Sequence, residues 1–117
     1  MTNTRRKFPR VAWPVEATYG TEDETHTTRT LDVSDGGALL SVDQNLSPGT
    51  RLMVKFHIDD FDLDPEPARV VRNGSAFEGT QLLMAVEFER PHPGLATATE
   101  FDREKSEWRN SRILRDR

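Results

Sequence analysis

The sequence has 117 residues, which suits one domain, and its 34% hydrophobic and 31% charged content predicts a small core under a polar surface. A formal net charge of −4 argues against a general binder of duplex DNA, because such binding depends on many phosphate contacts. The absence of cysteine excludes disulfides and thiolate chemistry. No apolar run is long enough for a membrane span or a signal-peptide core, so we expect a cytoplasmic protein.

The start of the chain is a basic arm that contrasts with the acidic average. Residues 5–10 hold four cationic side chains and no acid. Arginine carries a planar fork of N–H donors that can bind phosphate oxygens, or the O6/N7 edge of guanine, with two hydrogen bonds. Pro9 favours an extended conformation for Phe8, so we expect a stretched arm able to fold over an anionic ligand. A solvated terminus without a function is the alternative.

Six segments have the pattern of β-strands, with β-branched residues or apolar side chains at every second position. They are residues 11–19, 25–31, 38–42, 51–58, 68–72 and 82–88. Pro14 places the first strand at an edge or a bulge, because proline cannot donate to a β-ladder. The alternation is clearest from Leu52 to Ile58. Asn73-Gly74 predicts a tight hairpin between the last two strands.

The cluster Asp32-Val33-Ser34-Asp35-Gly36-Gly37 between the second and third strands has the composition of a turn. A plain hairpin is the simplest interpretation. In a functional interpretation, the Asp32 carboxylate accepts the N–H donors of a guanine edge and Ser34 donates or accepts beside it. Gly37 has no Cβ and lets a ligand approach the backbone closely. The residues alone indicate a purine nucleotide or another small anion.

Two motifs occur together in this order, Arg6-x-x-x-Arg10 and Asp32-x-Ser34-x-x-Gly37. In this the chain resembles the PilZ domain family, whose signature is RxxxR followed by [D/N]xSxxG, and the resemblance extends over nearly its whole length. It implies an all-β fold, a six-stranded antiparallel β-barrel with a C-terminal α-helix. The corresponding parts of the chain are a basic arm at residues 1–10, the barrel at 11–92, and a helix at 93–117 packed on or beside the barrel.

By the same resemblance the ligand is cyclic di-GMP, a bacterial second messenger with two guanines and two phosphates, and no further cofactor is implied. The arginine pair would clasp phosphates and guanine faces from the arm, and the Asp-Ser-Gly motif would receive a guanine on the barrel surface. Arg5 extends the arm as in family members that take two intercalated ligand molecules per domain. The expected ligand-binding residues are Arg5, Arg6, Arg10, Asp32, Ser34, Gly36 and Gly37.

No arrangement in the sequence indicates catalysis or a metal site. The acidic stretch from Asp59 to Glu66 fails as an EF-hand, because Pro65 occupies the position of the required glycine and Val71 that of the bidentate glutamate. The three histidines have no metal-ligand spacing, and no glycine-rich phosphate loop precedes a helix. We therefore expect a binding protein rather than an enzyme.

From Leu95 to Leu114 the pattern becomes that of a surface helix with a narrow apolar stripe. The residues expected on its buried face are Phe101 and Trp108, together with Leu95, Ala98 and Ile113. Trp108 could instead present a ridge to a partner protein. Two functional hypotheses remain. The first is a ligand-sensing module that acts on a partner protein in trans, and the second is a ligand-independent adaptor of the same fold in motility or pilus assembly. We favour the first, because every motif position is filled.

Overall fold

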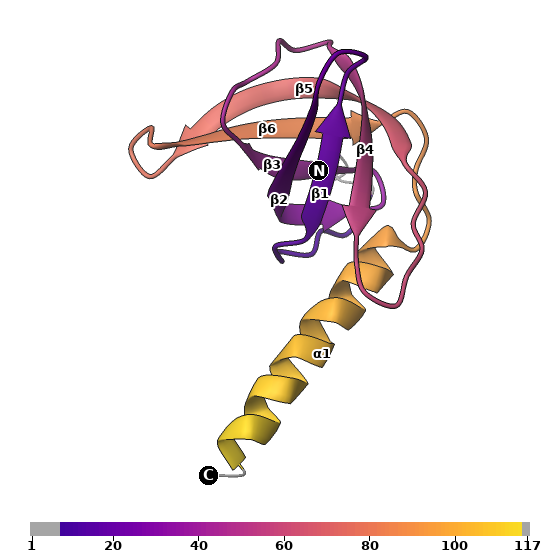
Figure 1. The fold of residues 1–117 in the computed structure, drawn as a ribbon, viewed down its shortest axis with the longest axis vertical. Helices are drawn as coiled ribbons and strands as arrows, with labels where there is room; N and C mark the ends of the chain where they lie inside the picture. Colours follow the sequence, from indigo (N-terminus) through magenta and orange to yellow (C-terminus); the bar gives the residue numbers. More distant parts are fainter. Residues whose placement is uncertain (1–7, 116–117) are drawn as a thin grey trace, which may run out of the picture.

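A computed structural model describes residues 8–115 of the chain, with side chains to residue 109. Its elements are β1 (Glu16–Gly20), β2 (Thr25–Ser34), β3 (Gly37–Val42), β4 (Arg51–His57), β5 (Glu66–Ala76), β6 (Gln81–Phe88) and α1 (Leu95–Arg115). The antiparallel strands follow the order β1-β2-β3-β6-β5-β4, and β4 pairs again with β1, so the sheet closes into a barrel (Figure 1). The expected six-stranded barrel with a C-terminal helix is confirmed.

The core follows the alternation that the sequence predicts. Along β4, Leu52, Val54 and Phe56 are at most 4% exposed, while the residues between them face outward. The same alternation holds along β6, where Phe88 meets Phe56 edge to face with ring centroids 5.7 Å apart. Each such buried side chain contributes about 1.5–3 kcal/mol through removal of apolar surface from water. These inward rows therefore determine which face of each strand points outward.

The predicted first strand, residues 11–19, is regular only in its second half, where it forms β1. Pro14 has no N–H for a ladder. The Thr30 side chain of β2 bonds to the backbone on both sides of Pro14 instead. Its hydroxyl accepts from the Val15 N–H at 2.9 Å and donates to the Trp13 carbonyl at 2.8 Å. The segment before β1 is thus attached to β2 through this side chain as well as through backbone hydrogen bonds.

The hairpin predicted at Asn73-Gly74 is wrong. Both residues lie inside β5 and pair with residues of β6, and the turn falls at residues 77–80. The Asn73 side chain donates to the carbonyl of Leu46 at 3.0 Å. The β5–β6 hairpin is therefore longer than expected and projects from one side of the barrel (Figure 1).

Two β-bulges interrupt the ladders. The register shifts at Leu31 in β2 and at Val71 in β5, so that neither residue has a partner on the neighbouring strand. A bulge of this kind bends the strand and changes the direction of nearby side chains. Leu31 and Val71 are 37% and 42% exposed although both are apolar.

The helix packs on the barrel through its first turns. Leu95, Ala98 and Thr99 are at most 1% exposed. The predicted burial is confirmed for Leu95 and Ala98 but wrong for Phe101 and Trp108, which are 49% and 59% exposed. Ile113 lies outside the residues whose side chains are described. Beyond its first turns α1 extends away from the barrel (Figure 1), which explains why burial decreases along it. Within residues 8–115, no helix combines the length and the apolar character needed to cross a membrane.

Candidate functional site

Arg10 and Asp32 meet near the end of β2. The Arg10 Nη1 donates to the Asp32 Oδ1 at 2.8 Å. Two backbone hydrogen bonds between Val11 and Val33, at 2.8 and 3.0 Å, hold the arm beside the strand. The two charged side chains are 35% and 23% exposed, so the ion pair is open to solvent and adds at most about 1 kcal/mol to stability. The ion pair with Asp32 therefore mainly fixes the orientation of the Arg10 side chain.

Ser34 orders the connection between β2 and β3. Its hydroxyl oxygen accepts from the N–H groups of Gly36 at 3.1 Å and Gly37 at 3.2 Å, and the hydroxyl lies 3.3 Å from the Gly37 carbonyl, to which it can donate. The side chain is buried. The turn itself covers only residues 35–36, so Ser34 lies in β2 and not in the turn as predicted. A buried hydroxyl with these partners makes the turn rigid.

Gly36 of the turn and Gly37 at the start of β3 are needed for different reasons. A Cβ on Gly37 would lie 2.2 Å from the carbonyl oxygen of Val86, so the packing of β3 on β6 requires glycine there. A Cβ on Gly36 would lie 2.6 Å from Cδ2 of Phe8, because the aromatic ring of the arm rests on the bare face of the turn. The role of both glycines toward a ligand stays a prediction.

Asp35, an unspecified position of the motif, faces the helix. Its Oδ1 accepts from the N–H of Ala96 at 2.8 Å and its Oδ2 from the N–H of Gly94 at 3.4 Å. These contacts satisfy N–H groups at the start of α1 that have no partner within the helix. The Asp35 carbonyl also accepts from the N–H of His92 at 2.7 Å. One short turn thus carries the motif and holds the start of the helix.

A cavity of about 540 Å³ lies between the arm, the β2–β3 turn, β5 and the end of β6. Its volume is typical of small-molecule sites. The residues that line it come from these four segments and are Phe8, Arg10, Ser34, Gly36, Gly37, Val71, Arg72, Glu87, Phe88, Glu89 and Pro91. In the described part of the chain, Arg10 and Arg72 are the cationic residues of this lining.

Most of the expected ligand-binding residues gather at this end of the barrel. They are Arg10, Asp32, Ser34, Gly36 and Gly37. Arg5 and Arg6 lie outside the described residues. The sequence did not indicate Val71 and Arg72, because the strand pattern over residues 68–72 does not reveal which way side chains turn after a bulge.

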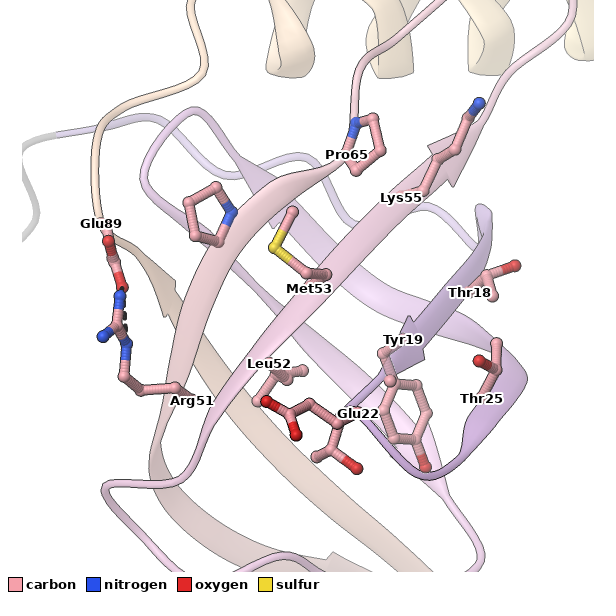
Figure 2. A pocket seen from close by; sticks show the side chains of 13 residues that line it. Thr18, Tyr19, Glu22, Thr25, Arg51, Leu52, Met53, Lys55, Pro65 and Glu89 are labelled. Carbon is pink, nitrogen blue, oxygen red and sulfur yellow. Dashed lines mark hydrogen bonds and ion pairs between the residues drawn. The ribbon is translucent and has the colours of Figure 1, made fainter.

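A second cavity, of about 500 Å³, lies on the barrel wall at β1 and β4 (Figure 2). Met53 and Tyr19 line it, and the ion pair of Arg51 with Glu89 lies at one edge. Burial, and to a smaller extent the Asp43 carboxylate, raises the pKa of Tyr19. No group of acids and histidines able to hold a metal occurs among the described residues. The motif residues lie elsewhere, and the candidate site is therefore the first cavity.

The barrel, its late helix and the motif at one end define a PilZ-like domain. The PilZ domain family matches residues 4–98, most of the chain, and the chain belongs to that family. No curated protein is significantly similar to it in sequence. PilZ domains are non-catalytic, which agrees with the expectation that the chain is not an enzyme.

Several solved structures share the fold. The PilZ domain of YcgR from Escherichia coli, solved with c-di-GMP, matches with a TM-score of 0.60 and 17% identity over 97% of this chain and 98% of that one. The Bacillus subtilis inhibitor of motility MotI/DgrA matches with a TM-score of 0.67 and 16% identity over 87% of this chain. The K. pneumonia MrkH–c-di-GMP complex matches with a TM-score of 0.60 and 16% identity over 93% of this chain. The chain spans 51% and 55% of these last two proteins. At such identities the likeness shows the fold alone.

Proposed function

We propose that this protein is a cyclic di-GMP receptor module that changes conformation on binding and acts on a partner protein in trans. The observation that carries the proposal is the meeting of Arg10, Asp32 and the Ser34 turn beside one cavity. Family membership supports the choice of ligand, since homologues bind c-di-GMP. The chemistry agrees, because arginine suits phosphates and guanine edges, and a carboxylate suits the guanine N–H donors.

In the proposed complex, Arg10 turns from Asp32 to a phosphate or a guanine face, and the freed carboxylate accepts from guanine. Breaking the exposed ion pair costs at most about 1 kcal/mol. A charge-assisted hydrogen bond to the ligand contributes about 1.5–3 kcal/mol. The exchange is therefore favourable, and the free protein keeps both side chains beside the cavity until the ligand arrives.

The arm gives the proposal its conformational step. Phe8 rests on Gly36 and lines the cavity, and we propose that the arm orders over the bound ligand from this point. Arg6 would join Arg10 on the phosphates, and Arg5 would support a second, intercalated ligand molecule. Ordering of this segment on binding would change the surface that a partner protein meets.

Titration calorimetry with cyclic di-GMP tests the proposal. We expect the unmodified protein to bind, and Arg10→Ala to bind about ten- to hundredfold more weakly. Its melting temperature should change little, because the pair with Asp32 is exposed. Arg10→Lys should not restore the affinity, since lysine lacks the planar fork. The matched control is Arg29→Ala, which removes an exposed arginine of β2 outside the cavity and should bind normally.

Absence of binding by the unmodified protein at saturating cyclic di-GMP would contradict the proposal. The ligand-independent adaptor would then be the remaining hypothesis. Phe101, which is 49% exposed on α1 and contacts Phe61 edge to face, would be the first position to mutate in a search for a protein partner.

A further inference from the structure

We infer that Arg72 and Val71, which belong to neither motif, form a further ligand contact on β5. Arg72 would bind a phosphate group of the ligand, and Val71 would provide an apolar surface for a purine base. The inference rests on the proposed function and adds residues to the same site. Both side chains line the cavity together with Phe8 and Arg10 of the arm.

The bulge in β5 explains why both side chains reach the cavity. Successive residues of a regular strand face opposite sides. Val70 is 1% exposed and faces the core, so a regular strand would point Val71 outward and return Arg72 to the core. The ladder passes directly from Val70 to Arg72, however, and Val71 has no partner on β6. As a result Val71 and Arg72 are both exposed, and both line the cavity.

Among the described residues that line the cavity, Arg72 is the cation that no carboxylate neutralises. The two acids of the lining are engaged elsewhere, since Glu87 pairs with Arg69 at 3.3 Å and Glu89 pairs with Arg51. The arginine of the arm is likewise paired within the motif. Among residues 8–109, Arg72 makes no ion pair. Its planar group of N–H donors is thus available to an anion, and a phosphate oxygen pair fits that geometry.

Val71 offers an apolar surface for a purine base next to the phosphate group that Arg72 would bind. A base presents a flat apolar face, which binds best against an apolar side chain. Val71 is 42% exposed, and Phe8 and Pro91 are further apolar members of the same lining. An exposed valine next to an unpaired arginine therefore matches a nucleotide, whose base and phosphate lie close together.

Titration calorimetry of Arg72→Ala with cyclic di-GMP tests the inference. We expect an affinity loss of about 5- to 50-fold. We also expect the affinity to depend less steeply on salt, because one ionic contact is lost. The matched control Arg29→Ala removes the same charge from an exposed strand position outside the cavity and should keep both the affinity and the salt dependence. Val71→Thr, a change of similar shape, should bind a fewfold more weakly, whereas Leu31→Thr at the other bulge should not.

The outcomes separate this inference from the proposed function. If the unmodified protein binds and Arg72→Ala has the same affinity and salt dependence, the inference is overturned while the proposed function stands. Equal losses in Arg72→Ala and Arg29→Ala would show general charge attraction and would also overturn it. If the unmodified protein does not bind cyclic di-GMP, the proposed function and the inference both fail.

Discussion

Gly37→Ala should destabilise the barrel even without ligand. The new Cβ would stand 2.2 Å from the Val86 carbonyl oxygen and 3.3 Å from the Cα of Glu87, although real Cβ atoms essentially never come closer than 3.0 Å to another heavy atom. Both obstacles are backbone atoms of β6, so the two strands have to move apart. Overpacking of this kind costs about 1–3 kcal/mol. In a chain of this size that lowers the melting temperature by about 3–15 °C.

Gly36→Ala is the matched control, one residue earlier in the chain, in the turn that precedes β3. Its Cβ would meet Cδ2 of Phe8 at 2.6 Å, and this ring belongs to the arm, which can move aside. We therefore expect the free energy of unfolding to stay within about 0.5 kcal/mol of the original value. The affinity for cyclic di-GMP should fall, because Phe8 loses its place on the turn.

Thermal unfolding followed by circular dichroism, without ligand, measures the first effect, and calorimetry with cyclic di-GMP measures the second. Equal melting temperatures for Gly37→Ala and the unmodified protein would refute the packing explanation of this glycine. If Gly36→Ala melts well below the unmodified protein, the contact with Phe8 contributes to stability and not only to the position of the arm.

Three further predictions concern the helix and the arm. Asp35→Ala removes the acceptor for the first N–H groups of α1 and should cost about 1 kcal/mol, with faster hydrogen exchange in that turn; unchanged exchange would contradict it. The hydrogen bond from Lys105 lowers the pKa of Asp60 in the folded protein. The stability that this ion pair contributes to the fold is therefore fully present above the ordinary pKa of 3.8, and it is lost as the pH falls through the lowered pKa. The melting temperatures of Asp60→Asn and the unmodified protein should thus converge only in acid, and a pH-independent difference would argue against it. Arg5→Ala should reduce the calorimetric stoichiometry from about two ligands toward one, because a second ligand adds phosphate charge that an arginine neutralises; one ligand bound by the unmodified protein at low salt would disprove the paired arrangement.

Strands with one buried and one exposed face could be predicted from sequence, because their alternation is local. The inward row from Leu52 to Phe56 is the clearest case. The Asn73-Gly74 hairpin could not be predicted correctly, since the pairing of β5 with β6 continues through both residues to Ala76 and Gln81 and overrides their local preference for a turn. The Asn73 side chain bonds to the Leu46 carbonyl, and the strand continues past it to a turn at residues 77–80.

The candidate site shows the same limit. The residue types and spacing of the two motifs predicted Arg10 and Asp32 as site residues. In the structure these two residues form an ion pair, although they are 22 positions apart in the sequence. Arg72 could not be found in this way, because a bulge depends on how two strands pair and not on the composition of either. The contact of Asp35 with the start of α1 joins residues 61 apart, and no local pattern encodes it.

The manner in which α1 leaves the barrel has a consequence for protein fusions. Its first turns belong to the core through Leu95, Ala98 and Thr99, while the rest extends outward (Figure 1). A unit transplanted into another protein must therefore end inside the helix, since a cut at residue 93 would remove part of the core. The orientation of a domain joined to the end of α1 would depend on the number of helical residues at the junction. Each residue added to or removed from a continuous helical junction would rotate that domain by about 100° around the axis and shift it by about 1.5 Å.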